Sequence, residues 1–172
     1  KTRLDLHRVL VADNGDIGIN IRISAPDSGD PEDPPRVRLG LFGVESSGND
    51  DHGMGFDLRY SEDQNVDMRI RLEYCRLSGN KKSGAYIDAD AIGDYSISHS
   101  NFEGNRGDSA LKLSGDATGT IIHVRDCRFP AGQGYSLLYR GSGLVNVTES
   151  ELDSIGPDNK PLLRESTGII TV

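Results

Sequence analysis

The sequence predicts an all-β protein that folds as a parallel β-solenoid, and three observations support this fold class. The first is a repeat, because the pattern at 66–90 returns at 92–114, as if one supersecondary unit stacked on its own copy. The second is spacing: equivalent strand positions recur at intervals of roughly 25 residues, too short for a parallel connection that contains a full helix. These positions are Leu72, Ile97, Val124, Val147 and Ile170. The third is composition, since 21 glycines and only 35% hydrophobic residues suit short strands joined by turns.

The elements follow in chain order. Residues 1–24 alternate apolar and polar side chains around the turn signal Asn14-Gly15, which predicts a first, irregular coil. Residues 25–36 are rich in Pro and Asp, and because Pro cannot join a sheet ladder they predict a solvated surface loop. Residues 37–172 predict the regular coils and end on a strand. We expect one domain that is a fragment of a longer chain, because the sequence begins without Met and ends on that strand.

Inward-facing side chains of successive coils are expected to stack in columns. The predicted columns are Ile70, Tyr95, Ile122 and Val145; Leu72, Ile97, Val124 and Val147; and, at a corner, Leu77, Phe102, Phe129 and Leu152. Each buried side chain of this kind contributes roughly 1.5–3 kcal/mol of transfer free energy. Gly79-Asn80 and Gly104-Asn105 mark a bend where Gly and Asn tolerate positive φ, and they predict an Asn ladder between coils.

The two cysteines occupy equivalent places two coils apart. Neighbouring strands lie about 4.8 Å apart, so Cys75 and Cys127, with Ser100 between them, are separated by roughly twice that distance. A disulfide requires Cα atoms within about 7 Å. We therefore expect two reduced, buried thiols. Two Cys residues without partnering His residues also do not form the ligand pattern of a zinc site.

The charge balance excludes some function classes. The net charge is −8, from 19 Asp and 8 Glu against 14 Arg and 5 Lys. An acidic surface argues against a nucleic-acid partner, which needs a basic face. No apolar run is long enough for a membrane span. The Asp-rich, Lys-poor bias is typical of proteins from halophilic organisms, and an ordinary acidic surface explains it equally well.

Three segments superimpose on one motif: 72–87, 97–113 and 124–138. Each has a small residue, an apolar residue, turn residues and then a second apolar strand. This motif resembles the right-handed parallel β-helix repeat of the pectin-lyase-like superfamily. The resemblance covers roughly residues 37–172 and implies a single-stranded right-handed parallel β-helix of about six coils. It also implies a carbohydrate context, because polysaccharide lyases, glycoside hydrolases, adhesins and tail spikes share this architecture.

One candidate site is an outward column on the later strand of each coil, formed by Asp57, Asp88 and Lys112. Strand spacing puts the two carboxyl groups within about 5–6 Å, which is comparable with the pair in a retaining glycosidase. These three residues are the catalytic candidates of a polysaccharide lyase or glycoside hydrolase. Asp57, Asp88 and Asp90 are instead candidates for a Ca²⁺ site, with no other cofactor expected. A solvated face of mixed charge is the third interpretation.

A second candidate site is an outward column on the earlier strand of each coil. Its donors and acceptors suit an extended sugar chain, and they suit a contact between subunits equally well. Its ligand-binding candidates are Arg71, His123, Asn146 and the flanking Arg125, and Tyr139, which lies on the later strand, is a further ligand-binding candidate. Tyrosines with the amphipathic character of sugar-binding platforms are expected at the surface. They are Tyr60, Tyr74, Tyr86, Tyr135 and Tyr139. The segment 146–148 is also an N-glycosylation sequon, whose Asn is predicted to point outward.

These observations predict a structural and recognition module of an extracellular or virion surface protein, such as a tail spike, fibre or adhesin. The module presents an elongated face to surface polysaccharide or to other subunits of an assembly. A homo-oligomer is expected, a trimer by analogy with tail spikes. The alternatives are the polysaccharide lyase or glycoside hydrolase and a purely architectural subunit without sugar affinity.

Overall fold

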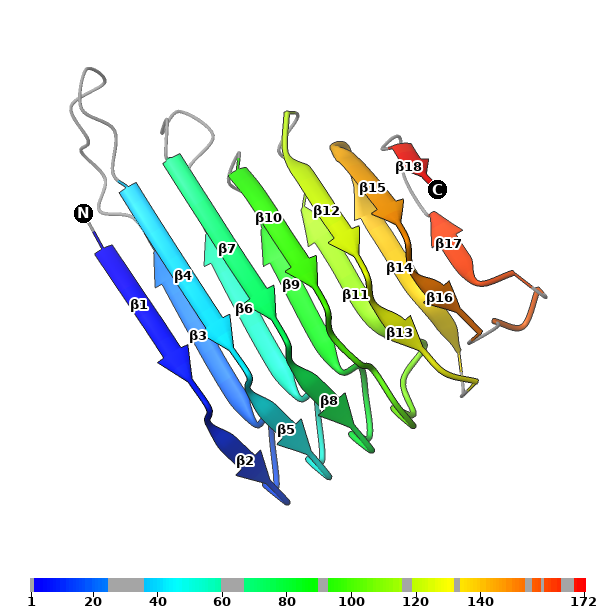
Figure 1. Ribbon diagram of the computed structural model, residues 1–172, viewed down its shortest axis with the longest axis horizontal. Coiled ribbons are helices and arrows are strands. Elements are labelled where there is room, and N and C mark those ends of the chain that lie inside the picture. The colour runs from blue at the N-terminus through cyan, green and yellow to red at the C-terminus, as the bar shows by residue number, and fades with distance from the viewer. Residues whose placement is uncertain are drawn as a thin grey trace.

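The computed structural model describes residues 2–24, 36–59, 67–89, 93–115, 119–131, 134–153, 156–158, 160–164 and 169–172. These residues form parallel strands stacked coil upon coil along one axis, and they contain no helix (Figure 1). This confirms the predicted all-β class and the parallel solenoid. The predicted loop at 25–36 lies outside the described residues except for Arg36, with which a strand begins.

The strands line up in parallel sheets along the axis. The first sheet has seven strands: β1 (Thr2–His7), β4 (Arg36–Phe42), β7 (Asp67–Glu73), β10 (Gly93–Ser98), β12 (Ile121–Arg125), β15 (Leu144–Thr148) and β18 (Ile169–Thr171). The second sheet has six: β3 (Ile19–Ser24), β6 (Met54–Arg59), β9 (Ala85–Ala89), β11 (Ser109–Gly115), β14 (Tyr135–Gly141) and β17 (Leu162–Arg164). The third face holds short strands: β2 (Leu10–Ala12), β5 (Glu45–Ser47), β8 (Arg76–Ser78), β13 (Arg128–Phe129) and β16 (Glu151–Leu152).

The register of the first sheet is the one that the repeat predicts. Leu72 pairs with Ile97, Ile97 with Val124, and Val124 with Val147. All four side chains are buried in the core. At the corner of the third face, the rings of Phe102 and Phe129 stack with centroids 4.8 Å apart. The sequence thus predicted which side chains fill the solenoid.

The solenoid has about four turns, fewer than the six or so coils that the sequence predicted. In the first coil, the apolar side chains of Leu6 and Ile21 are only partly buried, and near the other end Leu162 and Ile170 are partly buried too. These side chains remain partly exposed because a coil needs a neighbouring coil on each side to bury its apolar face.

The corner that follows the first sheet has a feature that the sequence did not predict. At this corner Tyr74, His99, Asp126 and Glu149 all have φ between 50° and 55°, in the left-handed region that side chains other than Gly rarely adopt. At the next corner, the residues with positive φ are Gly48, Gly79 and Gly104, together with Asp13 in the first coil. Tyr74 stacks on His99 with ring centroids 4.8 Å apart.

The Asn ladder and the free thiols are confirmed. Asn49 Nδ2 donates to Asn80 Oδ1 at 2.8 Å, and Asn80 Nδ2 donates to Asn105 Oδ1 at 2.9 Å. All three asparagines are buried. Cys75 and Cys127 are both free and buried. Burial raises the pKa of both thiols, that of Cys127 to about 11, so neither forms a reactive thiolate near neutral pH.

Candidate functional site

The outward face of the first sheet carries a row of polar side chains in register across the coils. Strand pairing aligns Arg71 with Ser96, Ser96 with His123, and His123 with Asn146. Arg71 and His123 are exposed, and Ser96 and Asn146 are half-buried. The predicted outward column is therefore present as one continuous row. Because neighbouring strands lie about 4.8 Å apart, consecutive donors and acceptors follow at that interval along the axis.

The C-terminal part of this face already has partners within the protein. Asn146 Oδ1 accepts a hydrogen bond from Thr171 Oγ1 at 2.6 Å. The candidate Arg125 lies on the same face of β12, where its Nε contacts Glu149 Oε2 at 2.8 Å and Asp126 Oδ2 at 3.4 Å. Since two carboxylates already satisfy this guanidinium, Arg125 has less to offer an anionic ligand than Arg71.

A second row of outward side chains lies two residues earlier on each strand. Along the axis, this row changes from cationic to apolar side chains. Arg3 pairs with Arg38, and Arg38 pairs with Arg69. Beyond Asp94, the same row becomes apolar at Ile121, and it continues through Leu144 and Ile169. Ile121 is 40% exposed and Ile169 is 56% exposed. One end of the face is thus cationic and the other end is apolar.

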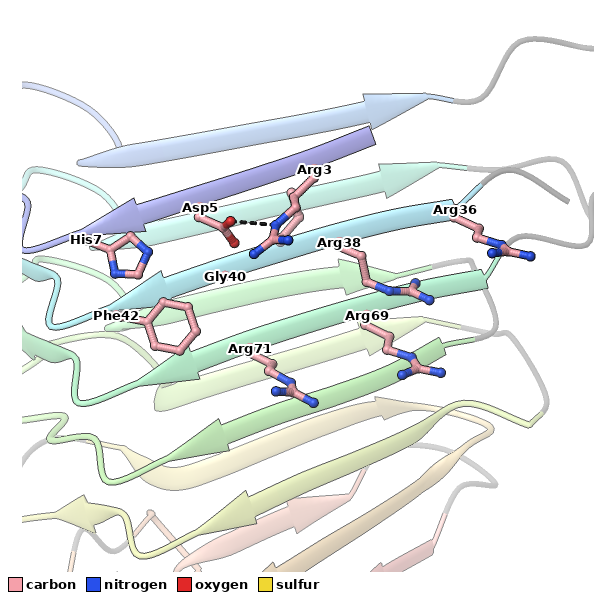
Figure 2. A pocket seen from close by; sticks show the side chains of 10 residues that line it. Arg3, Asp5, His7, Arg36, Arg38, Gly40, Phe42, Arg69 and Arg71 are labelled. Carbon is pink, nitrogen blue, oxygen red and sulfur yellow. Dashed lines mark hydrogen bonds and ion pairs between the residues drawn. The ribbon is translucent and has the colours of Figure 1, made fainter. Parts of the chain in front are cut away.

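The cationic end of the face is hollowed. A depression of about 510 Å³ lies over β1, β4 and β7, and we call it the arginine hollow (Figure 2). Its lining residues are Arg3, Asp5, His7, Arg36, Arg38, Leu39, Gly40, Phe42, Arg69 and Arg71. Five of the ten are arginines, in a chain whose net charge is −8. The sequence analysis singled out only Arg71 as a ligand candidate in this region.

Gly40 lines the hollow beneath the side chains of Phe42 and Asp5. Gly40 lies in register between Asp5 on β1 and Arg71 on β7. A Cβ atom at this position would lie 2.7 Å from the Phe42 ring and 2.8 Å from Asp5 Oδ1. The Phe42 ring stacks in turn on His7, with centroids 5.0 Å apart and planes inclined by 11°. Because Gly40 has no side chain, the Phe42 ring and the Asp5 carboxylate pack over its backbone, and the stacked rings of Phe42 and His7 form one wall of the hollow.

Ion pairs neutralise part of the charge in the arginine hollow. Arg3 Nε contacts Asp5 Oδ2 at 2.6 Å, and Arg38 forms an ion pair with Asp67 and also donates to the Asp67 carbonyl oxygen at 2.9 Å. The hydrogen bond from Arg38 lowers the pKa of the Asp67 carboxyl group, which therefore stays ionised. Arg69 lies 3.7 Å from the same carboxylate. Five arginines thus face two carboxylates, and the hollow keeps an excess of positive charge.

The other candidate column, on the second sheet, is only partly assembled. Asp57 on β6 lies directly opposite Asp88 on β9, as predicted. Lys112 is not in this column: it pairs with Tyr86, and Ser114 occupies the position opposite Asp88. The expected alignment of Lys112 is therefore wrong by two residues. Lys112 Nζ instead contacts Asp108 Oδ2 at 3.1 Å.

The residues around this pair are already engaged with one another. Burial raises the pKa of the Tyr86 hydroxyl, and the neighbouring Asp88 carboxylate, its hydrogen-bond partner, raises it further. The ring of His52 stacks on Tyr86 with centroids 5.2 Å apart. His52 Nδ1 accepts the Ser83 backbone N–H at 3.1 Å, and its Nε2 lies 3.3 Å from Asp51 Oδ1. Both imidazole nitrogens have protein partners, so His52 is not placed as a free general base.

Of the three calcium candidates, the structure brings together Asp57 and Asp88, which lie opposite each other on neighbouring strands. Asp57 pairs with Arg22, whose Nε lies 3.8 Å from Asp57 Oδ2. Asp90 lies outside the described residues. Among the residues that the structure describes, no group of three or more His, Cys, Asp or Glu side chains is arranged to hold a metal ion.

The tyrosine predictions are corrected in part. Tyr139 is only 2% exposed and Tyr135 is 9% exposed, so both belong to the interior and Tyr139 cannot contact a ligand on the outward face. Tyr74 is 62% exposed, as expected, and Tyr86 is half-buried. Tyr60 lies outside the described residues.

One signal in the sequence could have revealed the arginine hollow. Arg-x-Arg occurs at 36–38 and again at 69–71, each time on the outward positions of a strand. Because side chains alternate between the two faces of a strand, both arginines of each pair must project to the same side.

Comparisons with known proteins add no relative, since the chain matches no protein-family model, no curated protein and no solved structure. In the part of the chain that is described, no helix has the length and apolar character required to cross a membrane.

Proposed function

We propose that this protein is a glycan-recognition module of an extracellular or virion surface protein, similar in architecture to the right-handed β-helices of the pectin-lyase-like superfamily. Its outward face on the first sheet binds an extended sugar chain. One observation carries the proposal: the in-register row of Arg71, Ser96, His123 and Asn146 begins beside the ring stack of His7 and Phe42. In the assembled protein, this module forms a homo-oligomer, a trimer by analogy with tail spikes.

The chemistry of this face suits a sugar. A pyranose ring has an apolar C–H face and an edge of hydroxyl groups, so it binds where an aromatic ring adjoins hydrogen-bonding side chains. The stacked pair of His7 and Phe42 offers the ring surface, and the row that begins at Arg71 offers donors and acceptors at strand spacing. A rigid parallel sheet holds these groups in place before binding, which lowers the entropic cost of association.

A second candidate function is hydrolysis or elimination on a polysaccharide at the second sheet. The direct pairing of Asp57 with Asp88 favours it, because neighbouring strands bring two carboxyl groups to a separation of the kind that glycosidases use. It lacks support from Lys112, which lies beside Tyr86 rather than beside the carboxylate pair. A purely architectural subunit is the remaining alternative.

A glycan array probed with the wild-type protein tests the proposal. Two variants of the proposed face, Phe42→Ala and His123→Ala, should lose roughly tenfold or more in affinity for the glycans that the wild type binds. Asp88→Asn, on the second sheet, is the matched control and should bind as the wild type does. Release of reducing or unsaturated ends that Asp88→Asn abolishes would favour the enzyme instead. Failure to bind any glycan, together with burial of the first-sheet face against another subunit, would favour the architectural alternative.

A further inference from the structure

The arginine hollow differs from the rest of the outward face in charge. It brings together five of the fourteen arginines of the chain within one depression over three neighbouring strands. Among the described residues, only the carboxylates of Asp5 and Asp67 form ion pairs with them. Beyond Arg71, the hydrogen-bonding row on the described strands contains no further arginine and consists of Ser96, His123 and Asn146.

We propose that the arginine hollow is a subsite that selects an anionic sugar unit, one carrying a carboxylate or a sulfate group. This inference rests on the proposed glycan-binding function and names the class of glycan: an acidic polysaccharide. The sugar ring packs against the stacked Phe42 and His7, and its anionic group lies beside Arg71 and the neighbouring Arg69.

Arg71 is the principal anchor in this arrangement. It is exposed, and its partner on β4 is Gly40, which has no side chain of its own to cover it. Arg3 and Arg38 are held by acidic residues, whereas among the described residues no carboxylate lies within ion-pair distance of Arg71. A guanidinium presents a planar fork of donors that matches the geometry of a carboxylate or sulfate, and it does so better than an ammonium group.

The surroundings of the hollow favour a glycan over a nucleic acid. Nucleic acids require a basic surface that follows many phosphates, whereas this chain has a net charge of −8 and its cationic cluster spans only three strands of the first sheet. The row of Arg3, Arg38 and Arg69 continues with Asp94 and then with Ile121. A uniform polyanion would therefore meet an acidic and then an apolar surface beyond the hollow.

Calorimetric titration with three polymers of the same backbone tests the inference: dextran, carboxymethyl-dextran and dextran sulfate. We expect at least one charged dextran to bind at least ten times more tightly than neutral dextran, and the stronger of the two identifies carboxylate or sulfate as the preferred group. Arg71→Gln should weaken that binding roughly ten- to hundredfold, and Arg71→Lys should restore only part of it. Arg106→Gln is the matched control, because Arg106 is exposed outside the hollow and its loss changes the net charge equally.

Each contrary result has a separate meaning. Equal losses in Arg71→Gln and Arg106→Gln would overturn the subsite, because net charge alone would then explain the binding. Glycan-array binding without any preference for charged dextran would overturn the inference and leave the proposed function standing. Absence of binding to every glycan would overturn both. A poly-dT oligonucleotide that binds more tightly than both charged dextrans would overturn the inference in favour of a nucleic-acid ligand.

Discussion

Asn80 donates a hydrogen bond from Nδ2 to Oδ1 of Asn105, 2.9 Å away on the next coil, inside a fully buried corner. Asn80 Oδ1 in turn accepts from both the Nδ2 and the backbone N–H of Asn49. The ladder ends at Leu77 O, which accepts from Asn105 Nδ2. Because each amide uses its donors and its acceptor at once, the ladder fixes the stacking of the coils that carry the binding face.

Replacing the central residue of the ladder should destabilise the protein strongly. Asn80→Ala leaves the buried backbone N–H of Asn49 without its acceptor and removes one of the two hydrogen bonds at Asn49 Nδ2 and at Asn105 Oδ1. We therefore expect a loss of roughly 2–4 kcal/mol in the free energy of unfolding. Asn14→Ala is the control, since Asn14 is exposed at the end of the ladder, and it should cost less than about 1 kcal/mol. Urea denaturation measures both, and similar losses in the two variants would contradict a structural role for the buried ladder.

Backbone conformation at the glycine corner gives a second prediction. Gly104 has φ of +64°, and a Cβ added there meets nothing closer than 4.0 Å, so Gly104→Ala should cost about 1–2 kcal/mol through backbone strain alone. Gly15 lacks a positive φ and has open space around it. Gly15→Ala should therefore be neutral or stabilising by up to about 1 kcal/mol. Thermal unfolding monitored by circular dichroism compares them, and the reverse order would refute the assigned bend.

The buried thiol of Cys127 predicts a loss of stability at alkaline pH. Burial raises its pKa in the folded protein from 9.0 to about 11, so above pH 9 the unfolded chain releases a proton that the folded chain retains. The stabilisation is complete below pH 9 and is lost as the pH rises towards 11. Between pH 8 and pH 11, the stability difference between the wild type and Cys127→Ala should shrink by roughly 2 kcal/mol. Urea unfolding at a series of pH values measures this difference, and a constant gap would show that the thiol is not buried.

His52 predicts a loss of stability at acidic pH. Burial lowers its pKa below 6.5, and the nearby Asp51 carboxylate opposes that shift without reversing it. The unfolded chain therefore binds a proton near pH 6.5 that the folded chain does not, and stability, complete above pH 6.5, falls as the pH falls. His52→Asn keeps an acceptor for the Ser83 N–H but does not titrate. Its stability should change less than that of the wild type between pH 7 and pH 5, whereas parallel profiles would contradict the neutral, buried imidazole.

Much of the fold could be predicted because the repeat specifies register locally. The inward columns through Leu72 and Leu77 recur at nearly regular intervals, and a period of two then determines which side chains face the core. The Asn ladder follows from the same intervals. The non-glycine residues in the left-handed region, such as Tyr74 and His99, could not be predicted, because their conformation is imposed by the stacked coils rather than by local propensity.

The errors on the second sheet have one physical source. The first sheet pairs Ile97 with Leu72, whereas the second sheet pairs Leu113 with Ile87, so the interval between partners is one residue longer on the second sheet. One additional residue thus enters the turn before β11. A shift of one residue exchanges inward and outward positions, so Tyr139, which pairs with Leu113, falls in the core. The longer interval also brings Ser114, two residues beyond Lys112, opposite Asp88.

The arginine hollow required the structure because it depends on pairing between coils of unequal length. The interval from Arg3 to its partner Arg38 is longer than the interval from Arg38 to its partner Arg69. Both intervals exceed the spacing of the clear repeat, which pairs Leu72 with Ile97. The role of Gly40 also depends on its neighbours, since the side chains of Phe42 and Asp5 fill the space that its own side chain would need.

The most direct test of the account is a nuclear magnetic resonance titration of the isotope-labelled protein with its best glycan from the array, followed through the backbone amides. The account predicts that the shifts concentrate on the first sheet, at Gly40, Phe42 and Arg71, and extend along the row to His123. Shifts concentrated around Asp57 and Asp88 on the second sheet, or spectra unchanged at saturating glycan, would contradict the assignment of the binding face.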